Sequence, residues 1–202
     1  YRIADSIAVA PAISEGFLVA AGNGGTISCL RLSDASRVWT RRALADIVTA
    51  PAAGNGMAYV ASLDQHLRAW PLSFERPTPA WEFLAKAPLS DSPTIVGDSV
   101  YQQVPGHGLH RFAAAPANRP DGLLEWVSPQ AGGSVAARLG DRLLVWDGDR
   151  SVMQVVDERT GDLIDSVELP RVDSVHVTDL EGGAILLGGT GGRVLRLVPV
   201  AD

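Results

Sequence analysis

Apolar residues in this chain recur in short runs separated by Gly or Asp, and the same arrangement occurs five times. Each copy has one apolar run, a polar turn and a second apolar run. Neither run is long enough for a helix or follows a 3.6-residue period. The pattern therefore predicts five pairs of antiparallel strands. The windows align without a gap and cover residues 17–30, 57–70, 99–112, 142–155 and 184–197.

The turn of each window is marked by its eighth position, which holds Gly24, Asp64, Gly106, Asp149 or Gly191. These residue types suit the tight turns of β-hairpins. The last window, AILLGGTGGRVLRL, looks in isolation like a phosphate-binding loop, but no helical pattern follows it. Its glycines are therefore interpreted as turn residues. In the second apolar run of each window, the gapless alignment matches Val152 with Ile27 of the first copy and Val155 with Leu30. Matched residues are expected to face the same side of their sheets.

The windows begin 40, 42, 43 and 42 residues apart. An all-strand repeat of this length is typical of a β-propeller, with one four-stranded antiparallel blade per repeat. The inner strands are expected just before the windows, in residues 7–11, 47–51, 89–93, 132–136 and 174–178. The outer strands are expected after them and carry Trp39, Trp81 or Trp126. In the fourth repeat Asp165 takes the place of the Trp, which predicts a more exposed outer strand.

The sequence thus predicts an all-β protein, a single propeller domain over residues 1–202 with five blades. The blades cover about residues 5–42, 46–84, 88–128, 132–168 and 172–202, the last completed by residues 1–4. Tyr1 precedes Phe17 by 16 residues, as Trp126 precedes Arg142. The N-terminal residues are therefore predicted to supply the outer strand of the fifth blade, which would remove open strand edges. The alternative is a segment of a larger ring.

Several motifs carry a family resemblance. They are DASRVW at residues 34–39, DGLLEW at 121–126, the Thr160-Gly161 turn, and Ala50-Pro51 followed by MAYV at 57–60. Together they resemble the PQQ-like, quinoprotein-type propeller repeat over nearly the whole chain. Quinoprotein dehydrogenases of this fold hold PQQ and calcium with an adjacent pair of cysteines. Cys29 is the only cysteine here and no segment matches that cofactor site. None of the family's functional residues can be carried over, so the resemblance implies a member without cofactor or catalysis.

Composition narrows the function further. The formal net charge of −6 argues against nucleic acid as a partner. No apolar run approaches the ~20 residues that span a bilayer, so no direct membrane insertion is expected. A lone cysteine excludes an intrachain disulfide, and Cys29 is expected to be a small buried thiol. Tyr1 stands where an initiator Met would be expected, which suggests a processed chain or part of a larger protein.

The pattern predicts no catalytic, cofactor or metal site. His107 and His110 should not share a face, and Asp147-Gly148-Asp149 lacks the later acidic ligands of a calcium loop. Two candidate binding regions remain. A polar ring facing the central channel, or alternatively hydrogen bonds between blades, is predicted for Thr49, Asp91, Ser134 and His176. Rim loops are predicted at Asn23, Asp64, Gln65, His66, His107, Asp149, Arg150 and Arg171, with the insertion at residues 113–121 on the opposite rim.

These observations predict a binding or scaffolding module that acts through its rim loops in a protein–protein assembly. In the family that the chain resembles, members without cofactor serve as periplasmic scaffolds of outer-membrane protein assembly. Others are extracytoplasmic sensor domains of membrane-bound kinases. The resemblance therefore implies a periplasmic or extracytoplasmic location. The alternatives are small-ligand sensing through the channel and a remnant of a PQQ-dependent dehydrogenase.

Overall fold

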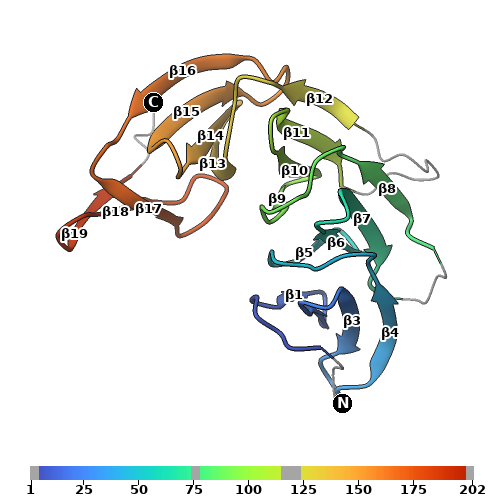
Figure 1. The fold of residues 1–202 in the computed structure, drawn as a ribbon. Coiled ribbons are helices and arrows are strands. Elements are labelled where there is room, and N and C mark those ends of the chain that lie inside the picture. The colour runs from blue at the N-terminus through green and yellow to red at the C-terminus, as the bar shows by residue number, and fades with distance from the viewer. Residues whose placement is uncertain (1–4, 74–77, 115–123, 199–202) are drawn as a thin grey trace. The chain divides into compact units, whose positions relative to one another are not determined.

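The computed structural model describes residues 5–73, 78–114 and 124–198, and within these ranges it contains strands and no helix (Figure 1). The strands form five antiparallel sheets, numbered here in chain order. The first sheet contains β1 (Ala12–Ser14), β2 (Phe17–Ala21), β3 (Thr26–Arg31) and β4 (Arg37–Arg42). The second contains β5 (Ala52–Gly54), β6 (Met57–Ala61), β7 (His66–Pro71) and β8 (Trp81–Leu84).

The remaining three sheets follow the same order of pairing. The third contains β9 (Thr94–Val96), β10 (Ser99–Val104), β11 (Gly108–Ala113) and β12 (Leu124–Ser128). The fourth contains β13 (Ser134–Leu139), β14 (Arg142–Asp147), β15 (Val152–Asp157) and β16 (Leu163–Glu168). The fifth has three described strands, β17 (Val172–Val177), β18 (Ile185–Gly189) and β19 (Arg193–Leu197). Each sheet is a meander, so consecutive strands are neighbours.

The five predicted strand pairs are confirmed, because each window forms the second and third strands of one sheet. The gapless alignment is wrong by one residue in the fourth copy. There Leu144 pairs with Val155, whereas in the first copy the matching Val19 pairs with Cys29, one position earlier in its window. The turn of the fourth hairpin comes one residue later, and a shift of one residue reverses the face of every side chain that follows. Val152 and Val155 therefore point to the face opposite the predicted one.

The inner strands of the first three repeats differ from the prediction. Residues 7–11, 47–51 and 89–93 were expected to be extended strands, but β1, β5 and β9 begin immediately after Pro11, Pro51 and Pro93. Proline has no amide donor and restricts the residue before it, so regular pairing starts only beyond it. In the last two repeats, which lack this proline, β13 and β17 do overlap the predicted segments.

The outer strands confirm the role predicted for tryptophan. Trp39 and Trp81 lie on β4 and β8 and are 2% and 1% exposed, and Trp126 lies half-buried on β12. Asp165 has the same place in the fourth sheet as Trp39 in the first. In the first sheet Trp39 pairs with Cys29, which pairs with Val19. In the fourth, Asp165 pairs with Val155, which pairs with Leu144, the residue that matches Val19. Along β16 five of six residues are exposed, as predicted.

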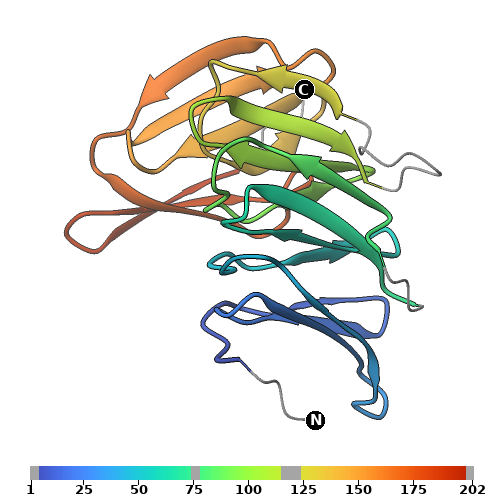
Figure 2. The ribbon, with the colours of Figure 1, turned by 45° about the vertical axis from the view of Figure 1, so that its right-hand side comes forward.

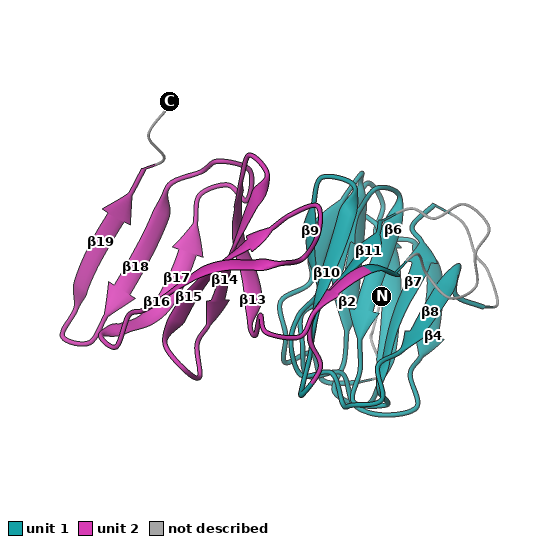
Figure 3. Cartoon of the chain, turned by 90° about the horizontal axis from the view of Figure 1, so that it is seen from above, with its two compact units in different colours: residues 1–106, 111–125 teal, residues 107–110, 126–202 magenta. Residues whose placement is uncertain are grey.

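The described chain divides into two compact units, coloured in Figure 3. The first comprises Tyr1–Gly106 and Arg111–Glu125, the second His107–His110 and Trp126–Asp202. Within the first unit, β1 contacts β5 and β5 contacts β9, so that successive sheets stack face to face (Figure 2). Their cores are apolar, with Trp39 against Trp70 in one interface and Trp81 against Phe112 in the next. In the second unit β13 contacts β17, and Ala137 packs with Ile185 and Leu187.

The predicted closure of the fifth blade falls on residues 1–4, which lie outside the described residues, and the single-domain boundaries also stay a prediction. The next residues resemble a connection between blades. The Ser6 carbonyl accepts a hydrogen bond from the Asn23 amide at 3.0 Å, as the Asp46 carbonyl accepts one from the Leu63 amide at 3.0 Å. Ser6 and Asp46 hold the same place in successive repeats. Ser6 thus makes the same backbone contact as Asp46, which follows β4.

Cys29 confirms the prediction of a buried thiol and leads to a test. It lies on β3 with no exposed surface, its Sγ 3.7 Å from the Leu72 carbonyl oxygen, and burial raises its pKa to about 11. Because the thiolate is the reactive form, we expect native protein to resist a thiol-reactive disulfide reagent near neutral pH. The same reagent should label Cys29 promptly in concentrated urea. Equal labelling rates in both states would contradict the buried position.

Candidate functional site

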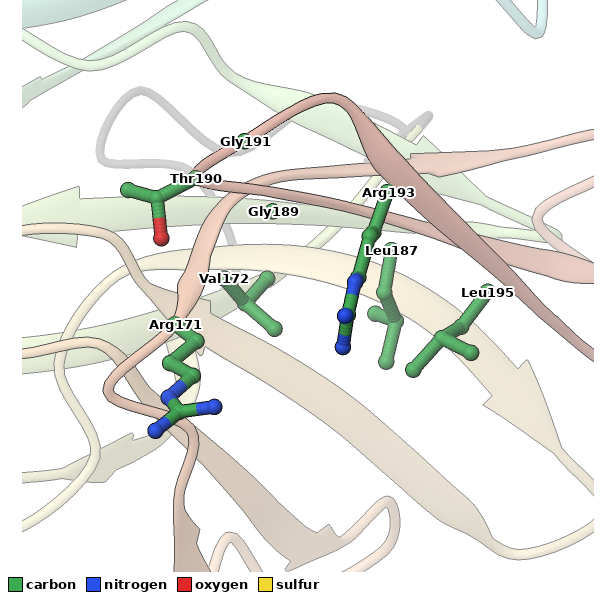
Figure 4. A pocket seen from close by; sticks show the side chains of 8 residues that line it. All are labelled: Arg171, Val172, Leu187, Gly189, Thr190, Gly191, Arg193 and Leu195. Atoms are coloured by element: carbon green, nitrogen blue, oxygen red, sulfur yellow. The ribbon is translucent and has the colours of Figure 1, made fainter.

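A cavity of about 540 Å³ lies on the fifth sheet (Figure 4). Its walls come from all three strands, from the residue that precedes β17 and from the β18–β19 turn. The lining residues are Arg171, Val172, Leu187, Gly189, Thr190, Gly191, Arg193 and Leu195. The whole site belongs to the second unit.

The strand register explains why cationic and apolar side chains line the same cavity. Leu187 pairs with Leu195, and Gly189 pairs with both Arg193 and Val172. Residues directly opposite in a sheet share a face, as do alternate residues of one strand. Figure 4 shows the side chains of Val172, Leu187, Arg193 and Leu195 on one side of the ribbon, with Arg171 beside them. The alternating sequence of β19 therefore produces an apolar floor with a guanidinium at one end.

The absence of a tryptophan from β16 helps to explain why this surface is open. In the first sheet the Trp39 Nε1 donates to the Pro71 carbonyl at 2.8 Å, and its ring lies 6.2 Å from that of Trp70, so it covers the outer part of the next sheet. In the fourth sheet Asp165 has the place of Trp39, and in the fifth Leu197 has the place of Trp70 in the repeat. Leu195 and Leu197 are accordingly 61% and 51% exposed.

Two unpaired cations flank the cavity. Arg171 and Arg193 are exposed, and among the described residues no carboxylate lies within ion-pair distance of either guanidinium. Other arginines of this unit do have such partners, because Arg138 contacts Glu181 at 2.9 Å and Arg150 contacts Asp147. The cavity therefore combines an apolar floor with positive charge that the described chain leaves uncompensated.

The four residues of the predicted channel ring have different surroundings. Thr49 is buried and its Oγ1 lies 3.5 Å from the Ala61 carbonyl oxygen, whereas the Asp91 carbonyl accepts from the Gln102 Nε2 at 3.0 Å. Both belong to the first unit. Ser134 begins β13, half-buried, and His176 is exposed on β17 opposite Leu186, both in the second unit. The ring as a whole stays a prediction.

The predicted rim residues also fall into two kinds. Asp64 is a structural group, since its carboxylate accepts from Arg68 at 2.7 Å and from the amides of Leu44 and His66 at 2.9 and 3.1 Å. The His66 Nδ1 lies 2.9 Å from the Asp64 carbonyl oxygen. The remaining predicted residues are exposed at turns or connections, and among them Arg171 alone lines the cavity. These exposed residues are Asn23, Gln65, His107, Asp149, Arg150 and Arg171.

No group of three or more His, Cys, Asp and Glu side chains among the described residues is arranged to hold a metal ion. No helix long and apolar enough to cross a membrane was found in the same ranges. The insertion predicted at residues 113–121 is described only at residues 113 and 114, so its role stays a prediction.

Sequence reasoning missed most of the cavity. Arg193, Leu187 and Leu195 were treated as ordinary members of the repeat, and Val172 as part of a connection. Two signals could have identified them. One is the alternating RVLRL run of β19, and the other is the missing tryptophan at Asp165, which leaves the neighbouring sheet uncovered.

The five meander sheets define a β-propeller repeat protein, and solved structures agree. A computationally designed protein, Ika8, superposes with a TM-score of 0.73 at 10% identity over 94% of this chain and 57% of its own. BamB from Moraxella catarrhalis superposes with a TM-score of 0.67 at 17% sequence identity, and the match covers 98% of this chain and 66% of BamB. The β-propeller domain of Cps50 (Swd1) from Myceliophteria thermophila superposes with a TM-score of 0.67 at 15% sequence identity. That match covers 91% of this chain and 62% of the domain. This chain thus spans less than two thirds of each.

The family can be stated more narrowly. The family model described as outer membrane protein assembly factor BamB matches residues 4–112, more than half of the chain. The chain belongs to this family of PQQ-like repeat proteins, which confirms the resemblance drawn from its motifs. No curated protein matches it in sequence.

Proposed function

We propose that this chain is a non-catalytic propeller module that binds a protein partner in an extracytoplasmic assembly. Membership of the BamB family supports the proposal, because the family is described as an outer membrane protein assembly factor. The compartment is part of the proposal and rests on the same family description.

The observation that carries the proposal is the exposed apolar surface of β19 and the residue after it. Val194, Leu195, Leu197 and Val198 are each more than half exposed, and they are consecutive or nearly so. Leu195 and Leu197 lie on one face of the strand and Val194 and Val198 on the other, so this strand exposes apolar side chains on both faces. Exposed apolar strand edges readily pair with another chain, whereas scattered exposed apolar residues are ordinary. Arg171, one of the rim residues predicted from the sequence, lines the cavity beside this strand.

The test compares complexes formed by matched variants. Tagged protein is cross-linked in cells, the partner is identified by mass spectrometry, and the complex is then rebuilt from purified components. The double variant Leu195→Ser, Leu197→Ser should bind the purified partner at least about tenfold more weakly, because buried apolar anchors dominate interface energies. The control is Leu44→Ser, which removes an apolar side chain that is 89% exposed in the other unit and should leave the affinity unchanged.

Small-ligand sensing through the channel predicts a different result. It requires a rise in melting temperature with a metabolite, sugar or ion that is lost in His176→Ala or Asp91→Ala. Such a shift, together with equal partner affinity for the native chain and the double serine variant, would overturn the proposal.

A further inference from the structure

Carboxylates occupy the tips of the central hairpins in three of the five sheets. In the first sheet the Asp5 carboxylate accepts a hydrogen bond from the Thr26 amide at 3.0 Å, and the Thr26 side chain, followed by its amide, lowers the pKa of Asp5. In the second sheet Asp64 accepts from the His66 amide, and in the fourth Asp147 accepts from the Arg150 amide at 3.1 Å. Asp5 precedes the first strand of its sheet, whereas Asp64 lies in the turn of its hairpin and Asp147 ends the strand before the turn. The hairpin tip of this repeat is therefore a recurrent place for an acidic group.

The hairpin tip of the fifth sheet shares one backbone hydrogen bond with the tips of the first two. The Gly192 amide donates to the Gly189 carbonyl at 3.2 Å, as Gly25 donates to Gly22 and Gln65 to Ser62 in the matching positions. Gly191 and Gly192 have φ of +91° and +76°, a conformation that glycine adopts without strain. The tip thus shares this hydrogen bond with tips that receive a carboxylate, but Gly24 and Asp64, which match Gly191 in the repeat, lack its positive φ.

Among the described residues no carboxylate forms an ion pair at the fifth tip, and two arginines line the cavity there. The cavity is bounded there by the Gly189–Gly191 turn, with Arg193 after the turn and Arg171 opposite, whose carbonyl accepts from the Thr190 amide at 3.2 Å. Both guanidiniums lie at the cavity without an acidic partner in the described chain. In the second sheet, by comparison, Arg68 is neutralised by Asp64 within the same hairpin.

We propose that this cavity receives an acidic side chain of the partner protein, carried on an extended segment with apolar neighbours that lies along β19. The inference rests on the proposed function and names the chemistry of the partner at that site. A guanidinium forms charge-assisted hydrogen bonds with a carboxylate, which are stronger than neutral ones. Arg171 and Arg193 would hold the acid, while Leu187 and Val172 form the floor beneath it.

The apolar surface beyond the cavity favours a polypeptide over a small free acid. From Leu195 the exposed surface continues along the strand to Leu197 on the same face, with Val194 and Val198 on the other. A small carboxylate would cover the arginines alone. An extended segment with one acidic residue and apolar residues two and four positions further on matches the order Arg193, Leu195, Leu197 along one face of β19, because alternate side chains of a strand share a face.

The experiment uses a synthetic probe of this chemistry. A capped peptide with one aspartate and with valine two and four residues after it, separated by serine, is titrated into the whole chain by calorimetry, beside a peptide with asparagine in place of aspartate and beside acetate. We expect saturable binding of the aspartate peptide alone, weakened by added NaCl. Arg193→Gln and Arg171→Gln should each weaken it by about tenfold. Arg142→Gln, which removes an exposed arginine elsewhere in the same unit, should not.

Each contrary result has a defined meaning. No saturable binding of the aspartate peptide, equal binding of the asparagine peptide, acetate that competes equally well, or equal weakening in Arg142→Gln would overturn the inference. Circular dichroism and melting temperature verify that each variant is folded. If the complex with the purified partner is unchanged in Arg171→Gln and Arg193→Gln but lost in the double serine variant of β19, the inference fails while the proposed function stands.

Discussion

Replacing Trp81 by alanine is expected to lower the free energy of unfolding by about 3–5 kcal/mol, the range for truncation of a buried aromatic side chain. Trp81 is almost completely buried between the second and third sheets. Its ring is stacked on Phe112 with centroids 5.6 Å apart and lies 5.9 Å from the ring of Tyr59. Truncation would leave a cavity that these rigid neighbours cannot fill. Urea unfolding followed by circular dichroism measures the loss.

The repeat supplies a matched control for this experiment. Asp165 has the place of the outer-strand tryptophan in the fourth sheet but lies on an exposed strand, so Asp165→Ala should change the free energy of unfolding by no more than about 0.5 kcal/mol. Trp81→Phe should cost less than Trp81→Ala, because the Trp81 Nε1 has no hydrogen-bond partner among the described residues and an aromatic ring would be retained. Equal losses for Trp81→Ala and Asp165→Ala would show that tryptophans do not hold successive sheets together.

The strand pairs and the repeat could be predicted from the sequence because they depend on local pattern. Apolar alternation around Gly or Asp determines where a strand ends and which face is buried, and five copies at nearly equal spacing reinforce one another. The errors are also local in origin. Pro11, Pro51 and Pro93 delay the inner strands, and a late turn shifts the third strand of the fourth sheet by one residue. Single residues of this kind leave little trace in a column alignment.

The candidate site could be predicted only in part, because it depends on the relation between two sheets. Arg171 was selected as a rim residue, but its neighbour in the cavity, Arg193, is more than 20 residues away and enters through the register of β18 and β19. The exposure of Leu195 and Leu197 follows from a substitution on another strand, at Asp165. Conversely, Asp64 was selected as a rim binding residue, yet its carboxylate already has amide and guanidinium partners. The position of Asp64 in the repeat does not reveal that its carboxylate already has these hydrogen-bond partners.

Replacing Asp64 by alanine is expected to be the second large loss, also about 3–5 kcal/mol, because it leaves the Arg68 charge partly buried without its main partner. The Asp64 side chain is only 6% exposed, and it joins Arg68 to the amides of Leu44 and His66. Among the acidic side chains of the described ranges, Arg68 would keep the contact of its Nε with Glu82 at 3.2 Å, whose side chain is half exposed. The matched control is Asp34→Ala, which removes an exposed carboxylate with one turn amide, that of Ser36, and should cost much less.

Acid titration gives an independent measurement of the same group. Burial raises the pKa of Asp64, but the hydrogen bond from the Leu44 amide and the Arg68 guanidinium outweigh it and hold that pKa below its ordinary value. Its contribution to stability is therefore complete above the ordinary aspartate pKa of about 3.9 and is lost as the pH falls through the lowered pKa of the folded state. We expect the native chain to lose stability on acidification more steeply than Asp64→Asn. Parallel profiles for the two proteins would mean that the Asp64–Arg68 pair contributes no charge-dependent stability.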